Sequence, residues 1–287
     1  MQSDLDLFAE QTEEDLAADR ERSKPVRRAN DLDGRTWTRY SISIWSDIRK
    51  TPDEIALGHP AIFPQQLVTR LIECFTRSDE KVILDPFMGS GSTIVAADRM
   101  GRTGIGFETS AEYYNLAARR LYNRELFQTS ELTSQLYLVD ARRMLEFLKP
   151  ESVDLVITSP PYWDILSQKR TADYKETRDY GSAPGDLSRI ADYNEFLKEL
   201  SQVFEKVYQV LKPSKYCIVI VMDLRKKDKF YPFHSDIADF MQEIGFIYDD
   251  IIIWDRRHEY NNMRPLGYPS VFRINKAHEY ILIFKKP

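Results

Sequence analysis

The chain has 287 residues, of which 43% are hydrophobic and 30% are charged, and its formal net charge is −5 at pH 7. Such a chain can bury a substantial core as one main domain, and it lacks an apolar run of about 18 residues, which excludes a membrane-spanning protein. The two cysteines, Cys74 and Cys217, and the four scattered histidines form no closely spaced set. This excludes a disulfide framework and a metal site and is typical of a reducing cytosol.

The N-terminal segment is acidic and polar. Residues 1–24 contain eight acidic and three basic residues, and they lack the hydrophobic region of a signal peptide. We expect residues 1–33 to be a polar, mobile arm and residues 34–287 to form the folded domain. Because the arm carries the excess of negative charge, the net charge of the chain neither supports nor excludes nucleic-acid binding.

The first strong signal in the body of the chain is a strand, a loop and a helix in succession. Residues 81–85 are predicted to form a buried strand, residues 86–93 a loop of small residues, and residues 93–100 a helix. Gly89 and Gly91 let the backbone approach a ligand closely, and the N–H groups at a helix start favour a carboxylate or a phosphate.

The next strand strengthens this interpretation. Residues 103–107 are predicted to form a strand that ends at Glu108, roughly 20 residues beyond the loop, where an acid can accept hydrogen bonds from ribose hydroxyls. The spacing therefore predicts a nucleoside-binding site. It does not match a dinucleotide fingerprint, because Ile94 stands where a third glycine is needed, nor does it match a phosphate-binding P-loop.

A second motif follows the apolar strand predicted over residues 153–157, where the sequence reads Thr158-Ser159-Pro160-Pro161-Tyr162-Trp163. Because proline has no N–H group, a carbonyl of this turn can accept hydrogen bonds from a substrate amine beside the Ser159 hydroxyl. The turn lies beyond the carboxyl end of a strand, where open α/β sheets bind ligands. Tyr162 and Trp163 would offer stacking faces to a base, although a large aromatic beside a strand end is also typical of a core.

Helices and strands alternate in the C-terminal half. Apolar residues recur at helical spacing from Tyr193 to Leu211, before Lys212-Pro213 ends the pattern. The remaining predicted elements are a strand over 216–222, a helix over 235–244, and strands over 246–254 and 278–284. This alternation predicts an α/β fold with a mostly parallel sheet covered by helices on both faces.

Three basic segments with interspersed aromatic residues lie between these elements, at residues 164–191, 224–233 and 256–276. They suit small recognition insertions, with Lys and Arg side chains binding the phosphates of a nucleic acid. The candidate DNA-binding residues are Lys169, Arg170, Arg256, Arg257, Arg264 and Arg273. Charged runs are also typical of solvated loops, so the sequence leaves both interpretations open.

The two motifs together resemble those of the DNA amino-methyltransferases, which use S-adenosylmethionine to methylate cytosine N4 or adenine N6. The resemblance covers roughly residues 55–287 and implies a Rossmann-like class I methyltransferase fold, with a seven-stranded sheet in which one strand is antiparallel. The residues that it assigns to the cofactor are His59, Pro60, Asp85, Phe87, Gly89, Ser90, Gly91, Ser92, Thr93, Glu108 and Asp140. In this family the loop from Asp85 to Thr93 holds the methionine part, Glu108 the ribose and Asp140 the adenine. The residues that it assigns to catalysis are Ser159, Pro160, Pro161 and Tyr162, with no metal ion.

The chain departs from the family pattern in two respects. Its cofactor motifs precede the catalytic motif, whereas many relatives with this loop carry them afterwards, and circular permutation of one fold accounts for such a change. Adenine enzymes usually carry Asp or Asn where this chain has Ser159, so the resemblance favours cytosine N4. The alternatives are adenine N6 methylation, RNA base methylation and an inactive DNA-binding homologue. Methylation of cytosine carbon 5 would need a cysteine nucleophile, whereas Cys74 and Cys217 lie in apolar patterns.

The chemistry of an exocyclic amine gives the motif a role. The lone pair of such a nitrogen is delocalised into the ring, and hydrogen bonds to Ser159 Oγ and the Pro160 carbonyl would localise it and stabilise the developing charge. A base in a duplex must first flip out and stack, for which Tyr162 is the first candidate. The resemblance implies double-stranded DNA as the partner, a cognate restriction endonuclease and a homodimer as further candidates, and a cytoplasmic setting in a prokaryote or a phage-infected cell.

Overall fold

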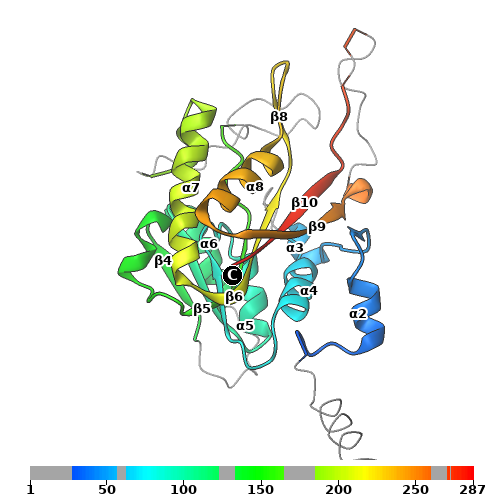
Figure 1. Ribbon diagram of the computed structural model, residues 1–287, viewed down its shortest axis with the longest axis vertical. Helices are drawn as coiled ribbons and strands as arrows, with labels where there is room; N and C mark the ends of the chain where they lie inside the picture. Colours follow the sequence, from blue (N-terminus) through cyan, green and yellow to red (C-terminus); the bar gives the residue numbers. More distant parts are fainter. Residues whose placement is uncertain (1–27, 57–62, 123–132, 165–184, 260–269, 272) are drawn as a thin grey trace, which may run out of the picture.

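The structure is a computed structural model, and it describes residues 28–56, 63–122, 133–164, 185–259, 270–271 and 273–287 (Figure 1). Several predictions lie outside these residues, namely those for His59, Pro60, Lys169, Arg170 and Arg264, most of the N-terminal arm, and much of the insertions at 164–191 and 256–276. Among the described helices, none is both long and apolar enough to cross a membrane.

An eight-stranded sheet forms the centre of the protein, in the order β1-β9-β10-β6-β5-β2-β3-β4. Its strands are β1 (Ile44–Trp45), β2 (Val82–Asp85), β3 (Thr103–Glu108), β4 (Gln135–Leu138), β5 (Val153–Thr158), β6 (Leu211–Val221), β9 (Ile247–Asp255) and β10 (His278–Lys285). All neighbouring pairs are parallel except those of β10, which runs antiparallel to both β6 and β9. The Rossmann-like fold with one antiparallel strand is therefore confirmed, with the two-residue strand β1 added at one edge.

Helices cover both faces of this sheet (Figure 1). They are α2 (Gly34–Tyr40), α3 (Pro52–Ala56), α4 (Gln65–Phe75), α5 (Ser92–Arg99), α6 (Ala111–Tyr122), α7 (Tyr193–Val210) and α8 (Phe233–Ile244), with short 3₁₀ turns η1 (Ala141–Glu146), η3 (Leu187–Arg189) and η4 (Arg257–Glu259). Successive side chains of a strand point to opposite faces of the sheet, so β6 contributes residues to two hydrophobic cores. Cys217 and Val219 pack with residues of α7 and α8, whereas Ile218 and Ile220 pack with residues of α4 and α5.

The structure changes two of the predicted boundaries. Residues 30–33 belong to the folded body rather than to the arm, because the buried Asn30 side chain donates a hydrogen bond to the Cys74 carbonyl (3.0 Å) and Asp33 caps helix α2. Strand β6 begins at Leu211, five residues before the predicted start, because Leu211 pairs with Val153 and the strand continues through Pro213 across an irregularity in the register.

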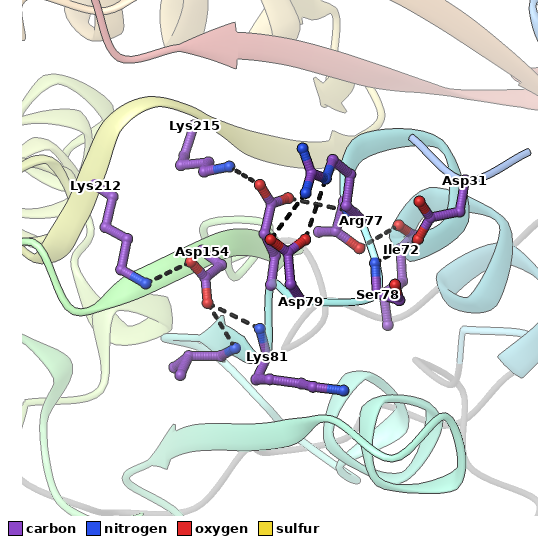
Figure 2. A network of polar contacts seen from close by, with 12 residues as sticks. Asp31, Ile72, Arg77, Ser78, Asp79, Lys81, Asp154, Lys212 and Lys215 are labelled. Carbon is purple, nitrogen blue, oxygen red and sulfur yellow. Dashed lines mark hydrogen bonds and ion pairs between the residues drawn. The ribbon is translucent and has the colours of Figure 1, made fainter. Parts of the chain in front are cut away.

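A network of polar contacts joins the starts of three strands, at the edge of the sheet opposite their carboxyl ends (Figure 2). The buried Asp154 carboxylate accepts hydrogen bonds from the backbone N–H groups of Lys81 (2.9 Å) and Val82 (3.0 Å), and from Lys212 Nζ (2.5 Å). These contacts explain an acidic residue in an otherwise apolar strand. They hold β5 beside β2 and β6, and so fix where the carboxyl ends of those strands lie.

Candidate active site

Asp85 ends β2 and is the first anchor of the glycine-containing loop. Its side chain is 2% exposed, and Oδ1 accepts hydrogen bonds from Thr158 Oγ1 (2.7 Å) and from the Phe87 backbone N–H (3.0 Å). Burial raises the pKa of Asp85 to about 6, although hydrogen bonds from Thr158, Thr93 and Phe87 oppose the shift. Because Thr158 is the last residue of β5, this contact joins the loop to the start of the Ser-Pro-Pro-Tyr turn.

Glu108 ends β3 and lies against the same loop. Its Oε2 accepts a hydrogen bond from the Gly89 N–H (3.0 Å), and its Oε1 accepts from the N–H groups of Thr109 (2.9 Å) and Ser110 (2.8 Å). Burial raises the pKa of Glu108, and the three N–H donors oppose that shift. The carboxylate of Glu108, which is predicted to bind the ribose, is therefore held in place by backbone N–H groups at both of its oxygens.

The two loop glycines serve different purposes. Gly91 has a φ of +79°, and a Cβ added there would lie 2.8 Å from the Cβ of Ala117 on α6, so only glycine fits this close approach. Gly89 has a φ of +48°, and a Cβ added there would meet no atom within 4 Å. The backbone at Gly89 thus borders open space, which fits a loop that receives a ligand.

Asp140 follows β4 and completes a row of acids along one edge of the sheet. It caps η1 through the Arg142 N–H (2.9 Å), and its carboxylate pairs with the Arg142 guanidinium (2.5 Å), which also pairs with Glu199 of α7. Because β2, β3 and β4 are consecutive neighbours, Asp85, Glu108 and Asp140 lie at successive strand ends. This order matches the methionine, ribose and adenine parts that the resemblance assigns to them.

The Ser-Pro-Pro-Tyr turn follows β5, which lies directly beside β2 in the sheet. Ser159 is half-buried, Pro160 is buried and Tyr162 is half-buried. The Tyr162 ring lies edge-on to Phe233 of α8, with 6.3 Å between the ring centroids, and its hydroxyl donates a hydrogen bond to Glu279 Oε2 (3.4 Å). The structure therefore brings the predicted amine site beside the predicted nucleoside site.

Trp163 does not offer a stacking face. It is 3% exposed, its Nε1 donates a hydrogen bond to the Ile190 carbonyl (2.7 Å), and its ring packs edge-on against Tyr193 and Tyr231. Its φ of +49° is rare for a bulky residue and is held by this packing. The interpretation of Trp163 as a core aromatic is the one that the structure supports, which leaves Tyr162 as the stacking candidate.

The insertion at 224–233 forms a hairpin, β7 (Leu224–Lys226) and β8 (Lys229–Tyr231), that lies against this turn. Lys226 Nζ lies 3.8 Å from the centroid of the Trp163 ring and pairs with the carboxylate of Asp164 (2.5 Å). The hairpin is thus fastened to the residues that follow Tyr162. Sequence reasoning identified the basic segment but not this contact.

Two of the predicted DNA-binding arginines have carboxylate partners within the protein. Arg256 pairs with Glu259 (2.5 Å) and with Glu279, and its side chain is 15% exposed. The exposed Arg257 pairs with Asp255 (2.6 Å) and lowers the pKa of Asp255 to about 2. Arg256 is therefore held by two carboxylates within the protein, and its contact with a phosphate stays a prediction. Arg273 is half-buried and stays a prediction.

Both cysteines are buried, in α4 and in β6. Burial raises the pKa of Cys74 to about 12 and raises the pKa of Cys217 further. Neither thiol can serve as a nucleophile at neutral pH, which agrees with the prediction that they are small buried hydrophobes. Within the described ranges, no three His, Cys, Asp or Glu side chains form a group that could hold a metal ion.

The strand order, with β10 antiparallel to its neighbours and helices on both faces, defines a Rossmann-like methyltransferase fold. The DNA methylase family model for N6 and N4 enzymes matches residues 6–119 and 153–287, and the chain therefore belongs to this family. As a member of this methylase family, the chain takes S-adenosylmethionine as its cofactor.

Comparison with individual proteins supports the same assignment. The chain is 31% identical over 166 residues to the type II methyltransferase M.MthZI of Methanothermobacter thermautotrophicus, covering 54% of this chain and 45% of that protein. It is 32% identical over 165 residues to M.MjaI of Methanocaldococcus jannaschii, covering 51% and 54%. The chain thus spans about half the length of the curated relatives it matches.

Solved structures also resemble it over part of their length. One is a putative DNA modification methylase of Thermus thermophilus in complex with S-adenosyl-L-methionine, at 31% identity, a TM-score of 0.37 and coverage of 52% of this chain and 53% of that one. Another is an S-adenosylmethionine-dependent methyltransferase of Methanosarcina mazei, at 15% identity, a TM-score of 0.46 and coverage of 73% and 93%.

Proposed function

We propose that this protein is a site-specific DNA methyltransferase that transfers a methyl group from S-adenosylmethionine to the exocyclic N4 of a flipped cytosine. The observation that carries the proposal is the hydrogen bond between Thr158 and Asp85 (2.7 Å). It supports the proposal because the turn after β5 and the loop after β2 lie at the ends of two adjacent strands. An amine bound by the turn and the sulfonium of a cofactor bound by the loop would then meet.

The residues proposed to bind the cofactor lie at the carboxyl ends of successive strands, and each is assigned to a different part of the cofactor. The loop from Asp85 to Thr93 holds the methionine part, Glu108 the ribose and Asp140 the adenine. When bound, the cofactor supplies an electrophilic methyl group. Glu108 suits its role because Thr109, Ser110 and Gly89 already fix its orientation, so its carboxylate needs little reorganisation to accept ribose hydroxyls.

The turn after β5 acts on the amine. The Ser159 hydroxyl and the Pro160 carbonyl accept hydrogen bonds from the amino group, which localises the nitrogen lone pair and stabilises the positive charge that develops during attack. Tyr162 stacks on the flipped base. Flipping the base out of the duplex costs a few kcal/mol, which contacts elsewhere on the DNA must offset. Pro161, which has no N–H donor, keeps the turn out of the sheet hydrogen bonding.

The DNA itself is proposed to lie against the hairpin β7–β8 and the basic segments around it. Lys229 at the start of β8 is exposed and can approach phosphates, whereas Lys226 is occupied by Asp164. Lys169, Arg170, Arg257, Arg264 and Arg273 remain proposed DNA contacts. We propose prokaryotic or phage double-stranded DNA in the cytoplasm as the substrate, a cognate restriction endonuclease as a partner in a restriction-modification system, and a homodimer as the assembly.

The choice of cytosine rests on Ser159, because the adenine enzymes that the motif resembles usually carry Asp or Asn at this position. A serine hydroxyl can accept one hydrogen bond from the amine and donate another to the base. Adenine N6 would use the same pocket chemistry. Transfer to RNA and cofactor binding without turnover are the remaining alternatives, and the product of the reaction distinguishes all four.

The test is to incubate the protein with unmethylated plasmid DNA and S-adenosylmethionine, digest the DNA to nucleosides, and identify methylated products by chromatography and mass spectrometry. We expect N4-methylcytosine in the wild-type reaction and much less of it with Tyr162→Ala. N6-methyladenine would keep the mechanism and reverse the base. Methylation of a matched transcript but not of the plasmid would overturn DNA as the substrate, and cofactor binding without any product would favour the inactive homologue.

A further inference from the structure

Helix α6 packs against the cofactor loop along one side. The helix begins three residues after Glu108, and Ala117 in its second turn approaches Gly91 so closely that a Cβ at position 91 would lie 2.8 Å from the Ala117 Cβ. The loop therefore has no freedom to move toward α6. A residue one turn further along the helix, Arg120, meets the loop at its two serines.

The guanidinium of Arg120 lies within hydrogen-bonding distance of three oxygen atoms of the loop. Its Nη1 lies 2.5 Å from the Ser90 carbonyl oxygen, 3.1 Å from Ser90 Oγ and 3.3 Å from Ser92 Oγ. Ser90 is 3% exposed and Ser92 is 5% exposed, so water does not compete freely for these contacts. Fixing Ser90 and Ser92 fixes the backbone where the loop becomes helix α5, which starts at Ser92.

The positive charge of Arg120 is only weakly neutralised by neighbouring negative charge. Burial lowers its pKa, but an arginine in a protein stays protonated. The three loop oxygens within its hydrogen-bonding distance are neutral. Glu54 attracts the guanidinium from a distance, while the oxygens of Glu54 accept hydrogen bonds from the N–H groups of Thr51 (2.8 Å) and Gln65 (2.6 Å). A positive potential therefore remains beside the loop, together with the N–H groups at the start of α5.

We propose that Arg120 is a positioning residue for the amino-acid end of the cofactor, which fixes the Ser90–Ser92 backbone and favours the negative carboxylate of the methionine part. The proposal rests on the assignment of the loop to that part. It makes the contribution of Arg120 selective: binding of a ligand that carries the amino-acid group depends on it, whereas binding of the nucleoside part, held at Glu108 and Asp140, does not.

The test compares two ligands that differ in this group. S-adenosylhomocysteine carries the amino acid, and 5′-methylthioadenosine lacks it. Their dissociation constants are measured by calorimetry, without DNA, for the wild type, Arg120→Met, Arg120→Lys and the control Arg119→Met. Arg119 is the matched control because it precedes Arg120 on the same helix, is exposed, and bonds the Asn115 carbonyl (3.3 Å) rather than the loop. Thermal unfolding of each variant establishes that it is folded.

We expect Arg120→Met to weaken the binding of S-adenosylhomocysteine about tenfold or more, and to change the binding of 5′-methylthioadenosine less than about twofold. Arg120→Lys, which keeps the charge, should lie between Arg120→Met and the wild type, and Arg119→Met should match the wild type. Equal weakening of both ligands, or none, would overturn the proposal. Because the measurement uses no DNA, failure of methyl transfer to any base would leave its result intact.

Discussion

The Tyr162 hydroxyl donates a hydrogen bond of 3.4 Å to the carboxylate of Glu279, which is 5% exposed in β10. Arg256 pairs with the other oxygen of the same carboxylate and with Glu259. The proposed stacking residue is therefore oriented from a strand two places away from its own in the sheet. Arg256 begins the basic segment 256–276 that is predicted to contact DNA, so Glu279 connects the start of that segment with the Ser-Pro-Pro-Tyr turn.

The first prediction is that Glu279→Gln lowers kcat about ten- to a hundredfold while the affinity for S-adenosylhomocysteine stays within twofold of wild type, because a displaced Tyr162 misplaces the base and not the cofactor. Tyr162→Phe should have a similar effect, and the double variant should be no worse than either single one. The matched control is Glu259→Gln, which also removes a partner of Arg256 but does not contact Tyr162. Additive losses in the double variant would show that the two residues act separately.

The second prediction separates transfer from cofactor binding. Tyr162→Ala should reduce transfer strongly with little change in cofactor affinity, because the ring is proposed to touch the base alone. Asp85→Ala should weaken both, since Asp85 anchors the loop through Phe87 and the turn through Thr158. Calorimetry with S-adenosylhomocysteine and a transfer assay measure the two quantities. Unchanged affinity in Asp85→Ala would contradict the assignment of the loop.

The third prediction concerns pH. The pKa of Asp85 is raised by burial from 3.8 to about 6, so the folded protein binds this proton more tightly than the unfolded chain does. Its contribution to stability is therefore complete below about pH 4 and is lost as the pH rises through about 6. Relative to Asp85→Asn, the free energy of unfolding of the wild type should fall by up to about 3 kcal/mol between pH 4 and 7.

Urea unfolding of both proteins across this range measures that difference. Glu108, whose pKa burial also raises, titrates in both proteins and largely cancels in the comparison. If the free energy of unfolding of the wild type, relative to that of Asp85→Asn, rose with pH, Asp85 would be stabilised in its charged form.

The fourth prediction concerns the network at the opposite edge of the sheet (Figure 2). Asp154→Asn should lower the free energy of unfolding by about 3 kcal/mol, because it leaves the partly buried Lys212 without its carboxylate and weakens two contacts with backbone N–H groups. Asp79→Asn, which removes an exposed ion pair with Arg77 (2.9 Å), should cost less than about 1 kcal/mol. Chemical denaturation compares them. Equal losses would show that burial does not distinguish these two carboxylates.

Most of the fold could be predicted from the sequence, because the hydrophobic patterns of its main strands are clear. The predicted strands over 81–85, 103–107 and 153–157 lie within one residue of β2, β3 and β5, and their order along the chain places the loop and the turn at one edge. Strand β1 was missed because two residues carry no periodic signal. Its pairing with β9 depends on residues about 200 positions away.

The environment of individual side chains was harder to predict. Trp163 and Arg256 belong to segments whose composition suits base stacking and DNA binding, yet their partners, Ile190 and Glu279, come from other parts of the chain. Glu279 itself carried a usable signal, an acidic residue within the apolar strand 278–284, since a buried charge requires a partner. Arg120 carried none, because contacts with a loop 30 residues away leave no pattern in a helix.

The contacts between Lys226 and both Trp163 and Asp164 bear on how target specificity could be changed in this protein. If the hairpin reads DNA, it does so as one rigid piece with the turn that positions the amine, so the spacing between the bases read and the base modified is set by a lysine and an aspartate. Exchange of residues 224–233 for those of a relative would then not be enough to transfer the target specificity of that relative. The transplanted hairpin would need its own counterpart of Lys226 to contact the retained Trp163 and Asp164.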